Sequence, residues 1–403
     1  MCFANNNLGA ALDLTDLAEK DSLKLLFAEN AGIVIQSKDN SIERLLNEVN
    51  IEFFNIGKVT ESDVLSIING TDVFTMTVSR LRDMWYKTSY LLDQKQTSNG
   101  LATERFNNYK NQPLQYKFPS QFTGKLKDVI ASGTKESVSK GEIDSSQTPR
   151  NEGKRPKAAI IREKGSNSER EMANAMYLAG FDVKDVHMTD LISGRETLED
   201  IQFIGAVGGF SNSDVLGSAK GWAGAFLYNE KANTALKNFF KREDTLSVGI
   251  CNGCQLFMEL EEINPEHEVH GKIDHNDSHK HESSFTSVTI QKNNSVMLST
   301  LEGSTLGVWI SHGEGKFNLP YTEDQYHIVA KYGYNAYPSN PNGSDFNTAM
   351  MCDKTGRHLV TMPHIERSIF QWNWANYPAG RKDEVSPWIN AFVNAKKWIE
   401  NKK

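Results

Sequence analysis

The sequence predicts an α/β fold over residues 156–403, a mostly parallel sheet flanked by helices, preceded by a smaller α+β piece over residues 1–131. Three observations support this prediction. After residue 156, short apolar runs alternate with helix-like stretches, as they do in a parallel sheet covered by helices. Residues 132–155 are rich in Ser, Lys, Glu and Thr and have hardly any large apolar side chain, which is typical of a linker. A glycine-flanked cysteine, Cys251, directly follows one of the apolar runs.

In the first part, apolar residues at helical spacing predict three helices, over residues 23–28, 42–49 and 73–90. The last of these is rich in Leu, Met, Trp and Tyr, a pattern more typical of a packed helix than of a ligand site. Two short apolar runs, 32–36 and 53–56, predict strands.

In the second part, the apolar runs predict strands over residues 158–161, 183–187, 204–207, 246–250 and 358–362. Helices are predicted over 168–179, 223–240 and 252–260. Ligands of such folds bind at the carboxyl ends of the strands, so functional residues are expected there.

Length and charge limit the functional classes. A chain of 403 residues with 38% hydrophobic residues is long enough for two domains with a sizeable core. The formal net charge of −7 argues against a nucleic-acid or membrane-surface partner. The densest basic stretch, Lys154, Arg155 and Lys157, lies in or beside the predicted linker.

No run approaches the ~18 apolar residues needed to span a bilayer, and the N-terminus lacks the pattern of a signal peptide. There are four cysteines, too few for a secreted disulfide framework in a chain of this length: Cys2, Cys251, Cys254 and Cys352. Reduced thiols and a cytoplasmic location are therefore expected.

The predicted strand 246–250 runs into Gly-x-Cys-x-Gly, and a helix-compatible stretch follows. This is the arrangement of a nucleophile elbow with cysteine in place of serine. A Cβ at Gly249 or Gly253 would collide with neighbouring backbone in such a turn. At the start of a helix, the thiol of Cys251 meets the positive end of the helix dipole, which lowers its pKa. Cys251 is therefore predicted to be a nucleophile.

A different interpretation starts from Cys251 and Cys254, which together form Cys-x-x-Cys. Such a pair can be a redox dithiol or half of a zinc site, and the remaining zinc ligands could come from His275, His279 and His281. The glycine spacing favours the nucleophile, and no metal site is assigned. For the stretch 275–281 a solvated loop is favoured over a metal site.

A cysteine nucleophile needs a base and a group that orients the base. His364 and Glu366 follow the predicted strand 358–362, in the order Pro-His-Ile-Glu-Arg. Two residues apart on an extended segment, both side chains would point the same way. Gly208 and Gly209 follow another strand; the N–H of Gly209, with that of Asn252, is predicted to form an oxyanion hole. A Gly-Gly pair after a strand, taken alone, is more often an ordinary turn.

These segments together resemble the triad glutamine amidotransferases of class I, which have a flavodoxin-like sheet. The likeness extends to the glutaminase end of the large-form phosphoribosylformylglycinamidine synthase family. It covers nearly all of residues 155–403 and is carried by RPKAAIIREKGSNSE, DVHMTDLISGR, GGFSNSDVLG, GICNGCQ, ISHGEGKF, YPSNPNGS and MPHIER in this order. On the matched motifs, the resemblance implies that the substrate is contacted by Gly208, Phe210, Gln255 and His312.

The resemblance implies a mechanism. Cys251 would attack the side-chain amide of L-glutamine and form a γ-glutamyl thioester, while His364 moves the protons and Glu366 orients His364. Ammonia would pass to synthetase domains of the same polypeptide, where ATP activates formylglycinamide ribonucleotide for conversion to the amidine in purine synthesis. ATP and Mg are expected in that region, and no cofactor is expected in this chain.

Residues 1–131 are similar to the tail of an AIR synthase-related synthetase domain, notably in CFANNNLGAALDL and LFAENAGIVIQ. The resemblance implies the C-terminal third of a longer polypeptide, without the ATP and ribonucleotide sites. Such a piece is expected to hydrolyse glutamine at most.

The sequence departs from the family pattern at three places. Asn212 and Ser213 replace Tyr and Gly near the predicted oxyanion hole, and Ile365 replaces a proline. Lys280 and His281 replace Arg and Phe before Glu282, so this segment is not predicted to contact the substrate. Two other classes stay open from the residues alone: an elbow-cysteine hydrolase such as a peptidase or deglycase, and a non-catalytic metal-binding interaction module.

Overall fold

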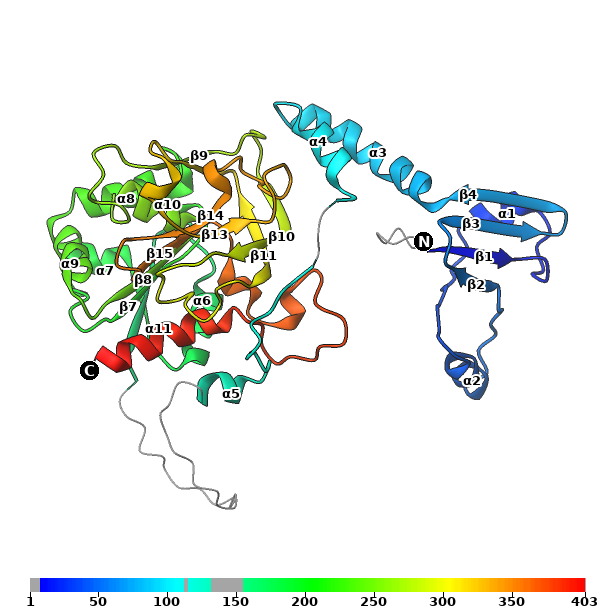
Figure 1. Cartoon of the computed structure of the whole chain (residues 1–403), viewed down its shortest axis with the longest axis horizontal. Coiled ribbons are helices and arrows are strands. Elements are labelled where there is room, and N and C mark those ends of the chain that lie inside the picture. The colour runs from blue at the N-terminus through cyan, green and yellow to red at the C-terminus, as the bar shows by residue number, and fades with distance from the viewer. Residues whose placement is uncertain (1–7, 112–114, 132–154, 403) are drawn as a thin grey trace, which may run out of the picture. The chain divides into compact units, whose positions relative to one another are not determined.

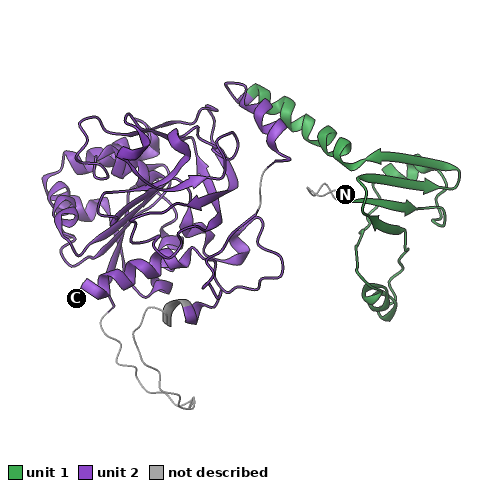
Figure 2. Ribbon diagram, in the orientation of Figure 1, with its two compact units in different colours: residues 1–95 green, residues 96–403 purple. Residues whose placement is uncertain are grey.

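The computed structural model describes residues 8–111, 115–131 and 155–402, which form two compact units, Met1–Lys95 and Gln96–Lys403 (Figure 2). The units divide earlier in the chain than the predicted domain boundary at residue 131. The reason is that residues of the 96–131 stretch contact the larger unit: Lys117 pairs with Thr305 in an isolated β-bridge, for example. The predicted linker, 132–155, lies outside the described residues except for Arg155, so it stays a prediction.

The first unit is built on a four-stranded sheet of order β2-β1-β3-β4 (Figure 1). Strand β1 is parallel to β3, and the other two pairs are antiparallel. Its strands are β1 (Gly9–Asp13), β2 (Gly57–Thr60), β3 (Val64–Asn69) and β4 (Asp72–Thr77). Its helices are α1 (Ser22–Phe27), α2 (Ser41–Glu48) and α3 (Val78–Gln96), the last of which ends at the unit boundary.

The predicted helices at 23–28 and 42–49 are confirmed, whereas both predicted strands are wrong. Residues 32–36 are exposed and pair with no strand in the described part of the chain; Ile33 is 88% exposed. An apolar run becomes a strand only where its backbone finds a neighbouring strand. Pairing likewise begins at Gly57, after the predicted strand 53–56. The helix expected over 73–90 begins at Val78, because Asp72–Thr77 pairs with β3.

The second unit holds a nine-stranded mixed sheet of order β11-β10-β13-β14-β15-β8-β7-β5-β6 (Figure 1). The parallel strands are β5 (Lys157–Arg162), β6 (Asp182–His187), β7 (Phe203–Ala206), β8 (Leu246–Ile250) and β15 (His358–Thr361). The antiparallel strands are β10 (Glu282–Ile290), β11 (Thr305–His312), β13 (His327–Tyr332) and β14 (Thr348–Cys352). A separate pair is formed by β9 (Lys272–His275) and β12 (Glu314–Asn318). The α/β class is confirmed, but only one half of the sheet is parallel.

Helices and short 3₁₀ turns join these strands. The helices are α4 (Leu101–Asn108), α5 (Leu126–Ala131), α6 (Glu169–Ala179), α7 (Met188–Ser193), α8 (Lys220–Leu227), α9 (Glu230–Lys241), α10 (Asn252–Glu259) and α11 (Ile389–Lys402). The 3₁₀ turns are η1 (Ser211–Asp214), η2 (Glu323–Gln325), η3 (Asp345–Asn347), η4 (Ile365–Ser368) and η5 (Gln371–Asn373). The helix predicted over 223–240 is two helices, because Asn229 caps a new one by accepting a hydrogen bond from the N–H of Ala232.

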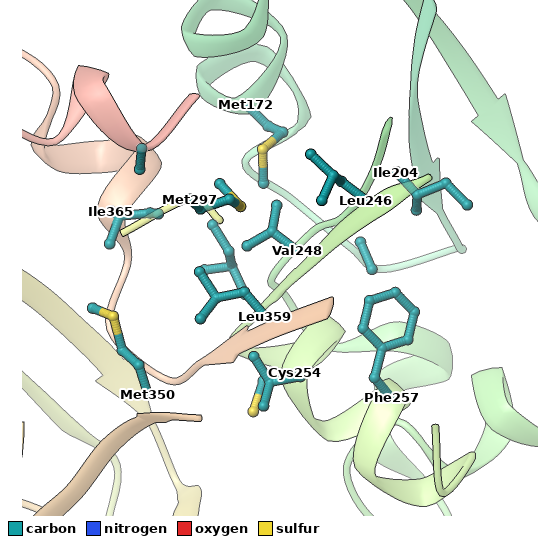
Figure 3. Close-up of a cluster of buried hydrophobic side chains, with 14 of the residues drawn as sticks. Met172, Ile204, Leu246, Val248, Cys254, Phe257, Met297, Met350, Leu359 and Ile365 are labelled. Carbon is teal, nitrogen blue, oxygen red and sulfur yellow. The ribbon is translucent and has the colours of Figure 1, made fainter. Parts of the chain in front are cut away.

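Strand order places the site. Strand β5 has β6 on one side and β7 on the other, so the chain reverses its direction across the sheet between these strands. Right-handed crossovers then put α6 and the pair α8 and α9 on opposite faces. Apolar side chains from β8, β15, α6 and α10 contribute to the core, among them Val248, Leu359, Met172 and Phe257 (Figure 3). None of the helices in the described part of the chain has the length and apolar character that crossing a bilayer requires.

Candidate active site

Three loops meet at the carboxyl ends of neighbouring parallel strands. Cys251 follows β8, Gly208 and Gly209 follow β7, and His364 follows β15, while β8 lies between β7 and β15 in the sheet. The carboxyl ends of adjacent parallel strands lie at one edge of a sheet, so the three loops come together there.

Cys251 lies at a sharp turn between β8 and α10. Its backbone has φ 52° and ψ −105°, a conformation that residues with a Cβ seldom adopt. The turn is tight: a Cβ on Gly249 would lie 2.4 Å from the carbonyl oxygen of Gly253, and one on Gly253 would lie 2.1 Å from that of Ala206. The predicted collisions at both glycines are confirmed, and the strand-to-helix turn has the geometry of a nucleophile elbow.

His364 and Glu366 form a buried pair, with 2.7 Å between Nδ1 and Oε1. The expectation of an extended segment is wrong, because Ile365–Ser368 forms the 3₁₀ turn η4 and the pair closes across the start of that turn. The N–H of His364 donates to the carbonyl of Trp309 at 2.8 Å, which fixes the backbone. With Nδ1 held by the carboxylate, Nε2 is the ring nitrogen left for a reacting group.

Gly208 lies between the two reactive side chains. A Cβ on this residue would lie 2.8 Å from Cε1 of His364 and 3.5 Å from Cβ of Cys251. The two side chains therefore border the same small space beside the turn after β7. Any larger residue at position 208 would intrude between them.

Two cavities adjoin these residues. One of about 270 Å³ is bordered by Cys251 and by four of the residues predicted for the oxyanion hole or the substrate: Gly209, Phe210, Gln255 and His312. The other, of about 530 Å³, is bordered by His364 and Glu366, and Ser311 lines both. The predicted nucleophile thus faces one cavity and its predicted base the other.

The predicted oxyanion hole involves the N–H groups of Gly209 and Asn252. Gly209 lies opposite Ser166 in an isolated β-bridge whose hydrogen bonds are made by the flanking residues, Asn167 to Gly208 at 2.8 Å and Phe210 to Gly165 at 2.9 Å. The N–H of Gly209 is therefore not used by the bridge. That of Asn252 belongs to the first turn of α10, where N–H groups have no partner within the helix. Their role as oxyanion donors stays a prediction.

Burial alone would raise the pKa of the Cys251 thiol, but interactions with the side chains of His312 and His364 outweigh it and lower the pKa to about 6. Burial alone would lower the pKa of His364, but the charge of Glu366 and the interaction with Cys251 raise it to about 10. At neutral pH the two groups are accordingly a thiolate and an imidazolium. Such an ion pair provides a nucleophile without a prior proton transfer.

Cys254 has a different environment. It is fully buried and belongs to the hydrophobic core, part of which Figure 3 shows in close-up. Burial, and then the charge of Cys251, raise its pKa well above the usual value for a thiol. Within residues 8–111, 115–131 and 155–402, no three His, Cys, Asp or Glu side chains are arranged to hold a metal ion. The geometry separates the two thiols into a reactive one and a core one.

His312 and Asn342 form a second polar pair at the Cys251 cavity. Nδ2 of Asn342 donates to the carbonyl of Gly315 at 2.8 Å, so its Oδ1 must accept, and it lies 2.6 Å from Nε2 of His312. Nε2 therefore carries a proton, and Nδ1 is buried without a hydrogen-bond partner among the described residues. This nitrogen is available to the thiol or to a ligand in the cavity.

Gln255 and Asn252 have supporting contacts. The Gln255 side chain accepts from Nδ2 of Asn252 at 2.9 Å and donates to the backbone carbonyl of Glu314 at 2.6 Å. Oδ1 of Asn252 in turn accepts from the N–H of Ser211 at 3.2 Å. These bonds tie α10 to β12 and to the loop after β7.

The loop after β7 is strained where the sequence departs from the family. Asn212, Ser213 and Asp214 have φ of 53°, 56° and 50°. Asparagine and aspartate tolerate this left-handed region, and glycine adopts it freely, whereas it is less favourable for serine. A glycine at position 213, which the resemblance implies, would fit the observed backbone better than the serine found here.

Several cavity residues were missed by the sequence analysis. The carbonyl oxygen of Ser311 lies 3.7 Å from Sγ of Cys251. The stretch 275–281, expected to be a solvated loop, contributes lining residues to the Cys251 cavity, and its lack of a substrate contact stays a prediction. The other missed lining residues are Asp214, Ser218, His275, His279, Lys280, His281, Gly313 and Glu314. Gly313 and Glu314 lie in the ISHGEGKF motif, which was a signal for them, whereas the 275–281 stretch departs from the family pattern.

Known proteins resemble this chain over its whole length. The profile of the CobB/CobQ-like glutamine amidotransferase domain matches residues 155–399. A probable phosphoribosylformylglycinamidine synthase, chloroplastic/mitochondrial, of Arabidopsis thaliana is 36% identical over 432 residues, covering 100% of this chain and 29% of the relative. The phosphoribosylformylglycinamidine synthase of Homo sapiens is 35% identical, covering 99% of this chain and 31% of its own length.

The chain therefore spans less than a third of the length of these two relatives. Among solved structures, PurLQS from Thermotoga maritima aligns with 59% of this chain and 97% of its own, at 22% identity and a TM-score of 0.46. The profile match covers more than half of the chain and includes all three converging loops. The chain belongs to the CobB/CobQ-like glutamine amidotransferase family.

Proposed function

We propose that this chain hydrolyses L-glutamine to glutamate and ammonia, with Cys251 as nucleophile, His364 as acid and base, and Glu366 as the residue that orients His364. The single observation that carries the proposal is the turn at Cys251, which exposes a thiol of lowered pKa to a cavity beside a buried imidazole–carboxylate pair. Family membership supports glutamine as the substrate.

In the first half of the reaction, the thiolate of Cys251 attacks the side-chain carbonyl carbon of glutamine. The oxygen becomes negative and is stabilised by the N–H groups of Gly209 and Asn252. His364 gives its proton to the nitrogen, the C–N bond breaks, and ammonia leaves behind a γ-glutamyl thioester. In the second half, neutral His364 takes a proton from water as the water attacks the thioester, and glutamate and the thiolate are released.

The cavity residues supply binding in this proposal. Gly208 leaves room between the nucleophile and the base, and Phe210, Gln255 and His312 border the space that the substrate occupies. Nδ1 of His312 offers a hydrogen-bonding nitrogen to the glutamine carboxamide, because its other ring nitrogen is committed to Asn342.

In the whole protein, we propose that the ammonia serves the ATP-dependent amidation of formylglycinamide ribonucleotide in purine biosynthesis. The names of the relatives support this assignment. The relatives are about three times longer, and the proposal places the ATP, Mg and ribonucleotide sites in synthetase regions beyond this chain. A cytoplasmic setting is proposed because the cysteines within the described residues, Cys251, Cys254 and Cys352, are free and buried.

Glutamate formation from glutamine tests the proposal. The chain should produce glutamate, and Cys251→Ser should reduce the rate by at least about 10⁴-fold, because the thiolate nucleophile is lost. Cys254→Ser is the matched control and should retain most of the activity, with both variants folded by circular dichroism. Equal loss in the two variants would contradict the separate roles, and absence of glutamate formation by the wild-type chain would contradict the function.

A glutamine-like electrophile adds a chemical test. Diazo-oxo-norleucine should label Cys251 and leave Cys254 and Cys352 unmodified, as mass spectrometry of peptides would show. Labelling elsewhere, with Cys251 intact, would contradict the assignment of the nucleophile. Incubation with ATP, Mg, glutamine and formylglycinamide ribonucleotide should give glutamate but no amidine, since the ATP and ribonucleotide sites are placed outside the chain.

A further inference from the structure

A strip of the second unit, residues 98–108, lies against the 275–282 loop that forms one wall of the Cys251 cavity. At one end of the strip, the N–H of Ser98 donates to the carbonyl of Ser278 at 3.1 Å, and Nδ2 of Asn99 donates to that of Asp277 at 2.8 Å. Both bonds are to the backbone of the loop. These two hydrogen bonds hold the middle of the loop and do not depend on the side chains of Asp277 and Ser278.

At the other end, Arg105 of helix α4 reaches a buried carboxylate. Glu282 is only 4% exposed; one oxygen lies 2.8 Å from Nη2 of Arg105 and the other 2.8 Å from the hydroxyl of Tyr337. The Arg105 guanidinium also stacks 4.6 Å above the Tyr337 ring. A carboxylate in this position needs both partners, because a buried charge without them is strongly destabilising.

Helix α4 is itself fastened to the same tyrosine. The carboxylate of Glu104 accepts from the N–H of Tyr337 at 2.9 Å, and Nδ2 of Asn108 donates to its carbonyl at 2.9 Å. Arg105 is therefore not a loose surface side chain that meets Glu282 by chance. It projects from a helix that is tied at two positions to the residue that shares Glu282.

Glu282 connects Arg105 and helix α4 to the catalytic cavity. It is the first residue of β10 and lies directly opposite His312 in β11, and its neighbour His281 lines the cavity. Within the loop, Nδ2 of Asn276 donates to the carbonyls of His312 at 2.7 Å and Lys280 at 3.1 Å. The position of Glu282 thus sets where β10 begins and where the loop meets the cavity.

We propose that Arg105 is a positioning residue for the glutamine cavity, acting through Glu282 to hold the 275–282 loop in its binding position. The proposal rests on the function proposed above. Without Arg105 the loop samples more conformations in the free protein, and substrate binding must then order it, which weakens binding. The triad is carried by β8 and β15, so the chemical step is left nearly unchanged.

The chain offers a closely matched control in Arg381. Its carboxylate partner, Asp383, has a side chain that is 6% exposed, against 5% for Glu282, and the two arginine side chains are 34% and 33% exposed. Asp383 also accepts from a tyrosine hydroxyl, that of Tyr377, at 2.7 Å. Neither Arg381 nor Asp383 lines the Cys251 cavity, so Arg381→Ala removes the same kind of network from a different place.

Amide hydrogen exchange and glutamine kinetics, both on the full chain, test the proposal. Arg105→Ala should speed exchange in residues 275–282 by roughly tenfold or more, whereas Arg381→Ala should not. Arg105→Ala should also raise KM for glutamine by about tenfold with kcat within about threefold of wild type. Alkylation of Cys251 by iodoacetamide should keep its wild-type rate, because the nucleophile itself is untouched.

Unchanged exchange in the loop, or equal loosening by both arginine variants, would overturn the proposal. A fall in kcat with constant KM would also overturn it, since Arg105 would then act on the chemistry. If Arg105→Ala does not fold, Tyr337→Phe removes only the hydroxyl contact of Glu282 and should show the same pattern more weakly. If Arg105→Ala speeds exchange in residues 275–282 but the wild-type chain forms no glutamate, Arg105 does position the loop and the proposed function is refuted.

Discussion

The charge state of Cys251 depends on a carboxylate that the thiol does not touch. Glu366 raises the pKa of His364, and the imidazolium of His364 helps to hold the pKa of Cys251 at about 6. In Glu366→Gln, His364 loses its proton at a lower pH, so the thiolate loses a stabilising positive charge. The pH midpoint of Cys251 alkylation by iodoacetamide should be about 6 in the wild type and should move upward in this variant.

Glu171→Gln is the matched control for that measurement. Glu171 lines the same neighbouring cavity as Glu366, but its carboxylate pairs with Arg367 at 3.5 Å. The alkylation midpoint should stay near that of the wild type. An equal shift in both variants would show a general effect of cavity charge. It would contradict a specific effect of Glu366 on the pKa of Cys251 through His364.

Residues with local signals could be predicted from the sequence, and those brought in by long-range pairing could not. The glycines around Cys251 and the strand before His364 mark the two loops within a few residues. Ser311 and His281, by contrast, reach the cavity because β10 and β11 pair with each other and their shared end lies beside Cys251. No local pattern fixes which strands become neighbours.

At the level of elements, the contact between β7 and α10 depends on Gly253. A Cβ there would lie 2.1 Å from a backbone oxygen, which cannot move aside as a side chain can. Gly253→Ala should therefore lower the free energy of unfolding by about 3 kcal/mol. Gly224→Ala, inside helix α8, is the control, because its Cβ would lie 3.8 Å from the Tyr228 ring. This substitution should raise the free energy of unfolding by about 0.5–1 kcal/mol.

Urea unfolding followed by circular dichroism measures both changes. If the free energy of unfolding falls in Gly253→Ala and rises in Gly224→Ala, steric crowding and not helix propensity determines the effect of the substitution at Gly253. A stabilised Gly253→Ala would mean that the strand and helix can separate at little cost, in conflict with the tight turn at Cys251.

Four of the parallel strands, β5, β7, β8 and β15, could be predicted because each is a run of mostly buried apolar residues. Strand β10, Glu282–Ile290, has Ser or Thr at five of its nine positions, so it lacks the apolar run that marks most of the parallel strands. The sequence does not show the turn η4, because the spacing of His364 and Glu366 alone does not distinguish an extended segment from a 3₁₀ turn.

At the scale of the molecule, the second unit is larger than the region matched by the family profile. Aromatic residues upstream of residue 155 pack on it: Phe118 lies 5.7 Å from Trp374 and 5.5 Å from Tyr377, and Tyr116 lies 5.1 Å from Trp374, measured between ring centroids. The guanidinium of Arg381 covers Phe118 at 5.1 Å. The stretch before the predicted linker therefore forms part of the second unit's packed surface.

A fragment over residues 96–403 should accordingly unfold at a higher temperature than one over residues 155–403, because the shorter one exposes the aromatic surface around Trp374. Phe118→Ala in the full chain should lower the unfolding midpoint of the second unit as well. Equal midpoints for the two fragments in a thermal scan would show that residues 96–131 add no stability to that unit.

Composition could predict that the chain has two parts but not where they divide, because the stretch 96–131 contains ordinary loop and helix residues. Its membership in the second unit follows from contacts more than 170 residues away in sequence, such as that between Arg105 and Glu282.

The backbone angle at Cys251 has a consequence for the evolution of the chain. A residue with a Cβ held at φ 52° and ψ −105° costs of order 1–3 kcal/mol, and glycine would relieve much of that cost. Selection for folding alone would drift toward the relaxed residue and lose the sulfur. A strained backbone conformation that holds a sulfur at this point is thus expected of a reactive residue, whatever its substrate.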